Sequence, residues 1–192
     1  MSFDEGGHAC RSRYCAVRQY NKDKPGKYRV NFFILSDAQA YFISHIDVYQ
    51  GKNAGNINIH ESVKHLPTTQ KAMANALIAA MVTNDPNVYR AVFSDNRYSS
   101  FELSVYMREK LKILTAGTIR KNRKGFDKEL FNMTTKNSVR GDSGLYYDEI
   151  NNVALAQWHD NKIVNVVSTL GVSGKVDVKR RVGQSVVEIT YK

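Results

Sequence analysis

Apolar positions along the chain fall into short runs, some with strand-like and some with helix-like spacing. Residues 28–35 and 41–49 are dense in aromatic and β-branched side chains, which is typical of strands, and the polar break at 36–39 favours a hairpin between them. Residues 88–93 and 113–118 predict two further short strands, the first of them of a buried type.

Two segments have helical periodicity. One begins near residues 67–69, carries alanines and larger apolar side chains on adjacent stripes, and is expected to end at 84–86. The other is expected to begin at Ser99, because Ser99 and Glu102 have the spacing of a capping box. The apolar stripes of both helices predict core contacts. Residues 6–27 indicate a polar, basic loop.

The pattern of apolar and polar residues changes after Arg120. Polar loops there alternate with strand-like runs at 153–158, 163–167 and 186–191, and we expect Trp158 to lie in the core of this part. The sequence therefore predicts two units: residues 1–119 as an α/β core, and residues 120–192 as a β-rich insertion subdomain. The order strand, hairpin, helix, strand, helix, strand matches the ribonuclease H-like plan, an α/β fold with a mixed sheet and helices.

Two aspartates occupy matching places in this plan. Asp4 and Asp95 each lie at the end of a short apolar, strand-like run. In the ribonuclease H-like plan the first and fourth strands run side by side, so the two carboxylates would meet at one edge of the sheet. Such an oxygen-rich site suits Mg²⁺, the metal of phosphodiester chemistry. An aspartate at a strand end is also a common turn residue or helix cap, and position alone leaves that alternative open.

Charge and cysteine content narrow the class. Twenty-eight Lys and Arg against 18 Asp and Glu give a formal net charge of +10, which suits a polyanionic partner such as nucleic acid. Two cysteines make no disulfide framework and favour a reducing compartment. His8, Cys10 and Cys15 lie close together, but no second pair of zinc ligands follows them. No signal peptide and no membrane span are expected.

Six short sequence words, in order, resemble the catalytic domain of piggyBac-type transposases, the piggyBac transposable element-derived proteins. Each word alone is weak, but together they cover nearly the whole chain. They are Phe-Asp-Glu at 3–5, Gln-Tyr-Asn-Lys-Asp-Lys-Pro-Gly-Lys at 19–27, Val-Tyr-Gln-Gly-Lys at 48–52, Phe-Ser-Asp-Asn-Arg-Tyr-Ser-Ser at 93–100, Gly-Thr-Ile-Arg-Lys-Asn-Arg-Lys-Gly at 117–125 and Trp-His-Asp-Asn-Lys-Ile-Val at 158–164.

The resemblance implies a metal-dependent nuclease and strand transferase of the DDE/DDD superfamily that acts on transposon and target DNA. Such enzymes hold two Mg²⁺ ions with three aspartates. Asp4 matches the first and Asp95 the second, which makes both the expected catalytic and metal-binding residues. The family implies DNA as partner, homo-oligomers of the full-length protein and a nuclear location.

The chain also departs from the family pattern. The third aspartate belongs to a Gly-Gly-Val-Asp type word that this sequence lacks, so we expect a fragment truncated at both ends that is inactive or poorly active alone. Asp160 belongs to the insertion and is expected to be structural, and Asp148 and Asp177 are weaker substitutes still. Arg97 replaces an aromatic residue that often follows the second Asp-Asn.

Three basic stretches are candidates for nucleic-acid contact. Phosphate contact is the natural role for Arg120, Lys121, Arg123 and Lys124, with a solvated surface as the alternative. The cluster at 175–181 suits phosphate binding or nuclear import. In the stretch at 11–29, we expect Tyr14, Tyr20 and Tyr28 to pack on the sheet, with stacking on bases as the alternative.

A second interpretation belongs to another class of protein. The chain could be a domesticated DNA-binding or protein-interaction module that keeps the transposase fold and has lost the chemistry. An in-frame continuation with the third aspartate in the genomic DNA would favour the enzyme. A genuine stop after Lys192 would favour domestication or decay.

Overall fold

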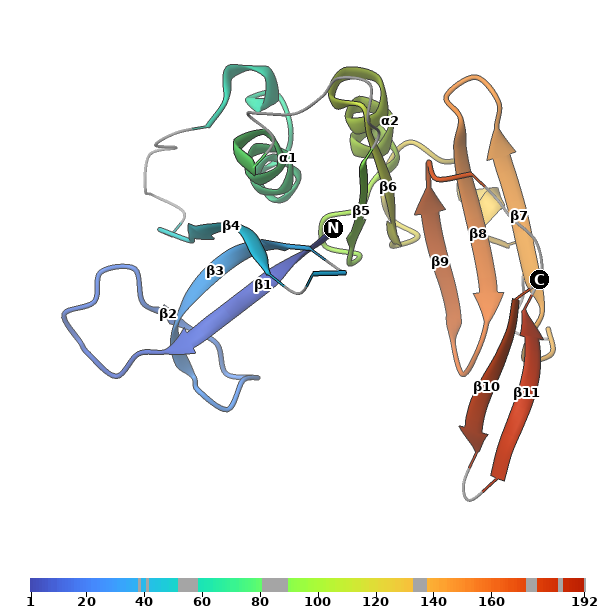
Figure 1. Ribbon diagram of the computed structural model, residues 1–192, viewed down its shortest axis with the longest axis horizontal. Helices are drawn as coiled ribbons and strands as arrows, with labels where there is room; N and C mark the ends of the chain where they lie inside the picture. Colours follow the sequence, from blue (N-terminus) through green and yellow to red (C-terminus); the bar gives the residue numbers. More distant parts are fainter. Residues whose placement is uncertain are drawn as a thin grey trace.

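The structure is a computed structural model that describes residues 1–37, 39–40, 42–51, 59–80, 90–132, 138–171, 176–182 and 185–191, the last two ranges in their backbone alone. Figure 1 shows two helices above one end of a long sheet, a strand-rich part at the other end and a separate hairpin near the C-terminus.

Strand β1 (Ser2–Ala9) lies at the centre of the first half of the sheet. It pairs antiparallel with β3 (Tyr28–Ser36), which in turn pairs antiparallel with β4 (Ile43–Val48). On its other side β1 pairs parallel with β5 (Arg90–Ser94), and β5 pairs parallel with β6 (Ile113–Thr118). The predicted mixed α/β fold is confirmed, and the first and fourth core strands are neighbours as expected. Assignment to the ribonuclease H-like class stays our interpretation of this order.

Helices α1 (Thr68–Ala80) and α2 (Phe101–Leu111) pack against one face of this sheet (Figure 1). A short 3-10 helix, η1 (Glu61–Val63), precedes α1. The apolar stripes expected from the sequence supply the core, whose fully buried members are drawn from both helices and four strands: Phe3, Leu35, Met73, Leu77, Val92, Leu103, Met107 and Ile113. Each such side chain contributes roughly 1.5–3 kcal/mol as an upper bound. The predicted end of the first helix lies outside the described residues.

The other face of the sheet is not covered by described residues. Ile46, Val48 and Phe93 expose 50%, 45% and 49% of their surface there or at its margin. Sheets with antiparallel strands commonly bury one face and leave the other to solvent, and this open face also carries the polar side chain of Asp4.

The second helix begins one residue later than the capping-box pattern predicted. Ser100, with an extended backbone, is the N-cap, and its hydroxyl accepts from the backbone N–H of Leu103 at 3.1 Å. The Ser99 hydroxyl is engaged elsewhere, because it donates to the carbonyl of Asp95 at 2.9 Å. Both serines can cap a helix, and the tight turn after β5 decides between them.

The insertion extends the same sheet. Strand β9 (Ile163–Ser168) pairs antiparallel with β6, and β8 (Val153–His159) and β7 (Ser143–Asp148) follow as antiparallel neighbours. A second apolar cluster, which includes Ile119, Phe131 and Leu155, lies beneath them beside the 3-10 helix η2 (Lys128–Asn132). Strands β10 (Val176–Val182) and β11 (Ser185–Tyr191) form a separate antiparallel hairpin. The division at residue 119 stays a prediction.

Several local expectations were wrong. Residues 6–9 belong to β1, and β2 (Gln19–Tyr20) forms within the predicted basic loop. Trp158 is only half-buried, because the buried row of β8 is Val153, Leu155 and Gln157, and alternation turns Trp158 the other way.

The tyrosines of the basic stretch do not pack on the sheet as predicted. Tyr14, Tyr20 and Tyr28 expose 82%, 60% and 50% of their surface. Tyr28 packs against Tyr20 and beneath the Arg18 guanidinium instead, with 4.5 Å from the guanidinium carbon to the ring centroid. Local cation–π and aromatic contacts therefore take the place of burial.

Candidate metal and nucleic-acid site

The register between β1 and β5 brings the two candidate aspartates to neighbouring positions. Ser2 pairs with Phe93 and Phe3 with Ser94, in parallel. Asp4 and Asp95 each follow this last pair by one residue, and both are exposed. Because Phe3 faces the helix-covered core, alternation along β1 turns Asp4 to the open face of the sheet.

Each aspartate keeps one carboxylate oxygen available. Asp4 Oδ1 accepts from the backbone N–H of Glu5 at 2.7 Å, and Asp95 Oδ1 accepts from the backbone N–H of Arg97 at 2.8 Å. The remaining oxygen of each has no partner within the part of the chain that the structure describes. Two carboxylate oxygens suit a Mg²⁺ ion that completes its shell with water and phosphate oxygens. The described residues contain no cluster of three or more potential metal ligands.

The turn that carries Asp95 is held by basic side chains from the loop after β6. Arg120 Nε donates to Asn96 Oδ1 at 2.8 Å, and Arg123 donates to the carbonyl oxygens of Asn96 and Arg97 at 3.1 and 2.5 Å. Both arginines are among the predicted DNA-contacting residues. Their place beside Asp95 was not predicted, because no local pattern in the sequence indicates which turn they contact.

Of the other two predicted DNA-contacting residues, Lys121 has a partner within the protein and Lys124 has none among the described residues. Lys121 donates through its ammonium to the carbonyl of Phe131 at 2.9 Å. Lys124 is exposed and has no hydrogen-bond or ion-pair partner among the described residues. Contact of these four residues with DNA stays a prediction, and an arginine that already makes one or two bonds still has further donors to offer.

Close packing between β5 and β6 fixes the start of the Asp95 turn. A Cβ atom on Gly117 would lie 2.3 Å from the carbonyl oxygen of Ser94 and 2.2 Å from the hydroxyl of Ser99. The Ser94 and Ser99 hydroxyls are themselves 3.0 Å apart. The glycine at this position therefore lets the two strands and the turn approach each other.

A buried tyrosine links the two strands behind the aspartates. The Tyr98 hydroxyl donates to Glu5 Oε1, and Arg97 forms an ion pair with the same oxygen at 2.6 Å. Tyr98 is fully buried, and its ring packs edge-on against Phe3 with the centroids 4.8 Å apart. Burial, followed by the hydrogen bond to Glu5, raises the pKa of Tyr98 far above its ordinary value. The sequence shows that Arg97 departs from the family pattern, but it does not indicate that Arg97 pairs with Glu5.

The weaker acidic candidates lie in the insertion, Asp160 after β8, Asp148 at the end of β7 and Asp177 in β10. Asp160 accepts from Arg140 Nε at 2.8 Å, in keeping with the structural role expected for it. Asp148 accepts from the backbone N–H groups of Ile150 and Asn151, and hydrogen bonds from Asn151 hold its pKa below the ordinary value. The side chain of Asp177 lies outside the described residues. Cys10 and Cys15 are free thiols.

Comparison with known proteins identifies the family. The sequence matches the family model described as Transposase IS4 over residues 1–191, and the chain belongs to this transposase family. Its fold is similar to that of the piggyBac transposase in the cryo-EM structure of a synaptic complex with hairpin DNA. The TM-score is 0.74 at 18% sequence identity, over 91% of this chain and 34% of that one.

At that identity the likeness shows a shared fold, and the chain spans about a third of the length of the solved relative. No curated protein sequence matches the chain. Among the described residues, no helix has the length and apolar character needed to cross a membrane.

Proposed function

We propose that the chain is part of a piggyBac-like DNA transposase catalytic domain, in which Asp4 and Asp95 are the metal-binding catalytic residues. The observation that supports this proposal is the parallel β1–β5 register: its last pair is Phe3–Ser94, and each aspartate is the next residue, Asp4 within β1 and Asp95 in the turn after β5. Membership of the transposase family supports phosphodiester chemistry at such a carboxylate pair.

When bound, Mg²⁺ supplies Lewis acidity toward phosphate oxygens and lowers the pKa of coordinated water. Asp4 and Asp95 would hold the ion, each through the oxygen that no described group uses. Glu5 is directed away, because Tyr98 and Arg97 both engage its carboxylate. Two carboxylates are too few for a pair of tightly held ions, so we infer weak metal binding and little cleavage by this chain alone.

DNA is the proposed partner. The net charge of +10, the exposed Lys124 and the remaining donors of Arg120 and Arg123 support contact with phosphates near the Asp95 turn. The solved relative is a complex with hairpin DNA. A nuclear location and homo-oligomers belong to the same proposal, and both rest on the family resemblance.

The second candidate is a DNA-binding or protein-interaction module without catalysis. Its support is the engagement of the other acids: Asp160 is paired with Arg140, and Asp148 caps its own turn. Among the described residues, no contact links Asp160 or Asp148 to Asp4 or Asp95. The two candidates share a fold. They differ in whether the chain cleaves DNA when a divalent metal is present.

The test combines metal binding with strand nicking. Mg²⁺ or Mn²⁺ is titrated into the wild type, Asp4→Asn, Asp95→Asn and the control Asp23→Asn, which removes an exposed carboxylate from the β2–β3 hairpin. We expect weak binding that is lost in the first two variants and kept in the control, and at most trace nicking of transposon-end DNA. Metal binding that survives both site variants would refute the site. Robust nicking that depends on Asp95 would refute the inferred low activity.

A further inference from the structure

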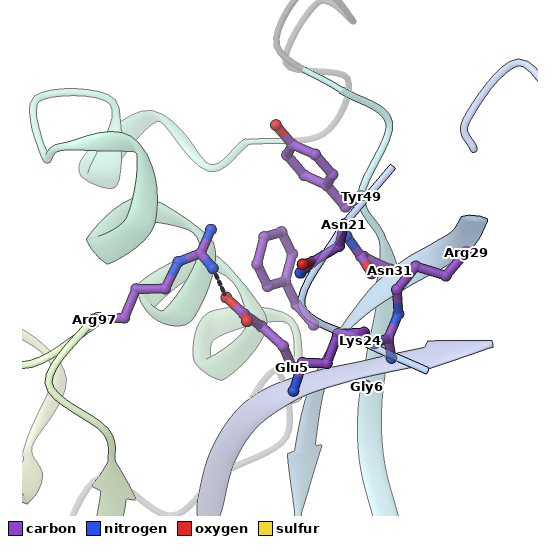
Figure 2. A pocket seen from close by; sticks show the side chains of 9 residues that line it. Glu5, Gly6, Asn21, Lys24, Arg29, Asn31, Tyr49 and Arg97 are labelled. Carbon is purple, nitrogen blue, oxygen red and sulfur yellow. Dashed lines mark ion pairs between the residues drawn. The ribbon is translucent and has the colours of Figure 1, made fainter. Parts of the chain in front are cut away.

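A small polar pocket opens behind the aspartates, on the helix side of the sheet. Its volume is about 140 Å³. Figure 2 shows Arg97 on one side of this space and Arg29 on the other, with the remaining polar side chains between them and the Tyr49 ring above. The polar residues that line it are Glu5, Asn21, Lys24, Arg29, Asn31 and Arg97.

Strands β1 and β3, the loop between β2 and β3, and the turn after β5 bring these residues together. In the β1–β3 register, Glu5 pairs with Phe33 and Gly7 with Asn31, so these positions share the face of Phe3. The β2–β3 hairpin supplies Asn21 and Lys24. Beyond Phe3, β1 has passed the end of β5, and Arg97 reaches across this gap to Glu5.

The pocket holds more positive charge than its own acid can neutralise. It has three cationic side chains and one carboxylate, and that carboxylate is already bound by Arg97 and Tyr98. Lys24 and Arg29 have no carboxylate partner within the described ranges. The Nε of Arg29 is buried without an acceptor, and an unpaired buried donor is costly. The unpaired donors of Lys24 and Arg29 therefore favour binding of an anion in this pocket.

The position of the Arg29 guanidinium depends on a glycine. A Cβ atom on Gly7 would lie 1.8 Å from an Arg29 terminal nitrogen and 2.1 Å from its Nε. The guanidinium thus lies flat against β1 where a side chain would otherwise stand. A substitution at Gly7 would displace this cation and leave the strand pairing of β1 in place.

We propose that this pocket binds the phosphate group of a nucleotide. Ammonium, guanidinium and amide donors converging from several sides match the several acceptor oxygens of a phosphate. Phe33 and Tyr49, in edge-on contact with centroids 5.8 Å apart, add an apolar wall suited to the attached sugar or base. The phosphate can come from a free nucleotide or from a DNA strand.

The location of the pocket favours the DNA strand. Glu5 follows Asp4 directly, and Arg97 follows Asp95 by two residues, so the pocket adjoins the carboxylate pair from the opposite face of the sheet. A strand cut at the aspartates would bring a neighbouring phosphate to this edge. That identification rests on the proposed function, whereas binding of the phosphate group itself does not.

Calorimetry without divalent metal tests the pocket. The probes are inorganic phosphate, deoxythymidine 5′-monophosphate and a short single-stranded oligonucleotide. We expect Lys24→Ala and Arg29→Ala to weaken monophosphate binding by about three- to tenfold each. Lys22→Ala is the matched control, since it removes the same charge from the same hairpin outside the pocket, and it should change binding less than twofold. Because Lys24 is exposed, its variant does not threaten the fold.

A variant with the opposite expected sign makes the test sharper. Glu5→Gln removes the one negative charge and keeps an acceptor for Tyr98, so monophosphate binding should become several-fold tighter. Absence of binding by all three probes, or equal weakening by Lys22→Ala and Lys24→Ala, would overturn the proposal.

The oligonucleotide arm identifies the source of the phosphate. Oligonucleotide binding that is weakened by Lys24→Ala supports a DNA strand, and monophosphate binding alone supports a free nucleotide. Asp95→Asn should leave monophosphate binding unchanged even if it abolishes metal binding. The pocket and the proposed metal site can therefore fail independently.

Discussion

Arg120 Nε donates a hydrogen bond of 2.8 Å to the side-chain oxygen of Asn96, the residue that follows Asp95. Arg123 adds two further bonds to backbone carbonyls of the same turn. The loop after β6 therefore holds the turn that carries a candidate metal ligand. Basic residues that would be assigned to DNA on charge alone have a positioning role within the protein.

Arg123→Ala should destabilise the protein. The change leaves the carbonyl oxygens of Asn96 and Arg97 without a charged donor, and we expect the free energy of unfolding to fall by about 1–3 kcal/mol. Urea denaturation measures this, with Lys124→Ala as the control because that side chain has no described partner. The same variant should weaken Mg²⁺ binding at Asp95. Equal stability of the Arg123 and Lys124 variants would show that these bonds do not hold the turn.

Gly117→Ala tests the close approach of β6 to the end of β5. The new methyl group would meet Ser94 and Ser99, and overpacking of this kind costs about 1–3 kcal/mol of unfolding free energy. In a Ser99→Ala background the cost should fall, since one of the two clashing oxygens is gone, while the Ser94 carbonyl remains. A double-mutant cycle measures this coupling. Full additivity of the two changes would contradict the assigned contact.

The sequence predicted the parts of this fold that depend on local periodicity. Strand 113–118 and the start of strand 28–35 match the structure, because alternation and the density of β-branched residues are local properties. The side-by-side position of β1 and β5, the strand that contains Asp4 and the strand that precedes Asp95, was expected from the order of elements and a known plan. The approach of Arg120 to Asn96 and of Arg97 to Glu5 was not, since loop conformation and side-chain direction decide both.

Trp158 and Ser99 show where local reasoning fails. Counting from Val153 in steps of two reaches Gln157, so a large aromatic at the next position faces away from the core and a polar amide is buried. Gln157 can be buried because its amide donates to the carbonyl of Phe131 at 2.7 Å. The choice of Ser100 over Ser99 as N-cap depends in the same way on a tertiary contact, here with the Asp95 carbonyl.

The β7–β8 turn offers a test of backbone strain. Asn152 has a φ of 53°, in the left-handed region, and its carbonyl accepts from Arg108 of α2 at 3.3 Å. Asn152→Val should lower the free energy of unfolding by about 1–2 kcal/mol, because a β-branched residue tolerates this conformation poorly. Asn152→Gly should be nearly neutral, and Tyr147→Phe measures the separate loss of the bond between Tyr147 and the Asn152 side chain. Equal stability of the valine and glycine variants would contradict this account.

Tyr98 should make stability depend on pH in the alkaline range. The pKa of Tyr98 is raised in the folded state. Below about pH 10 the tyrosine therefore keeps its proton in both the folded and the unfolded chain, and its contribution to the free energy of unfolding is fully present. Above pH 10 the unfolded tyrosine loses its proton while the folded one retains it. The unfolded state then binds fewer protons, and stability falls by up to about 1.4 kcal/mol per pH unit.

Tyr98→Phe isolates this effect. At pH 7 the variant should be less stable by about 1–3 kcal/mol, because the hydroxyl that donates to Glu5 is lost. Between pH 9 and 11.5 the difference between wild type and variant should shrink, since phenylalanine does not titrate. Tyr20→Phe, at an exposed position, is the control and should leave the pH profile unchanged. The predicted loss of stability above pH 10 requires that only the folded state keeps the proton of Tyr98. If the difference in free energy of unfolding between wild type and Tyr98→Phe stays constant across this range, the buried hydroxyl is not protected from ionisation.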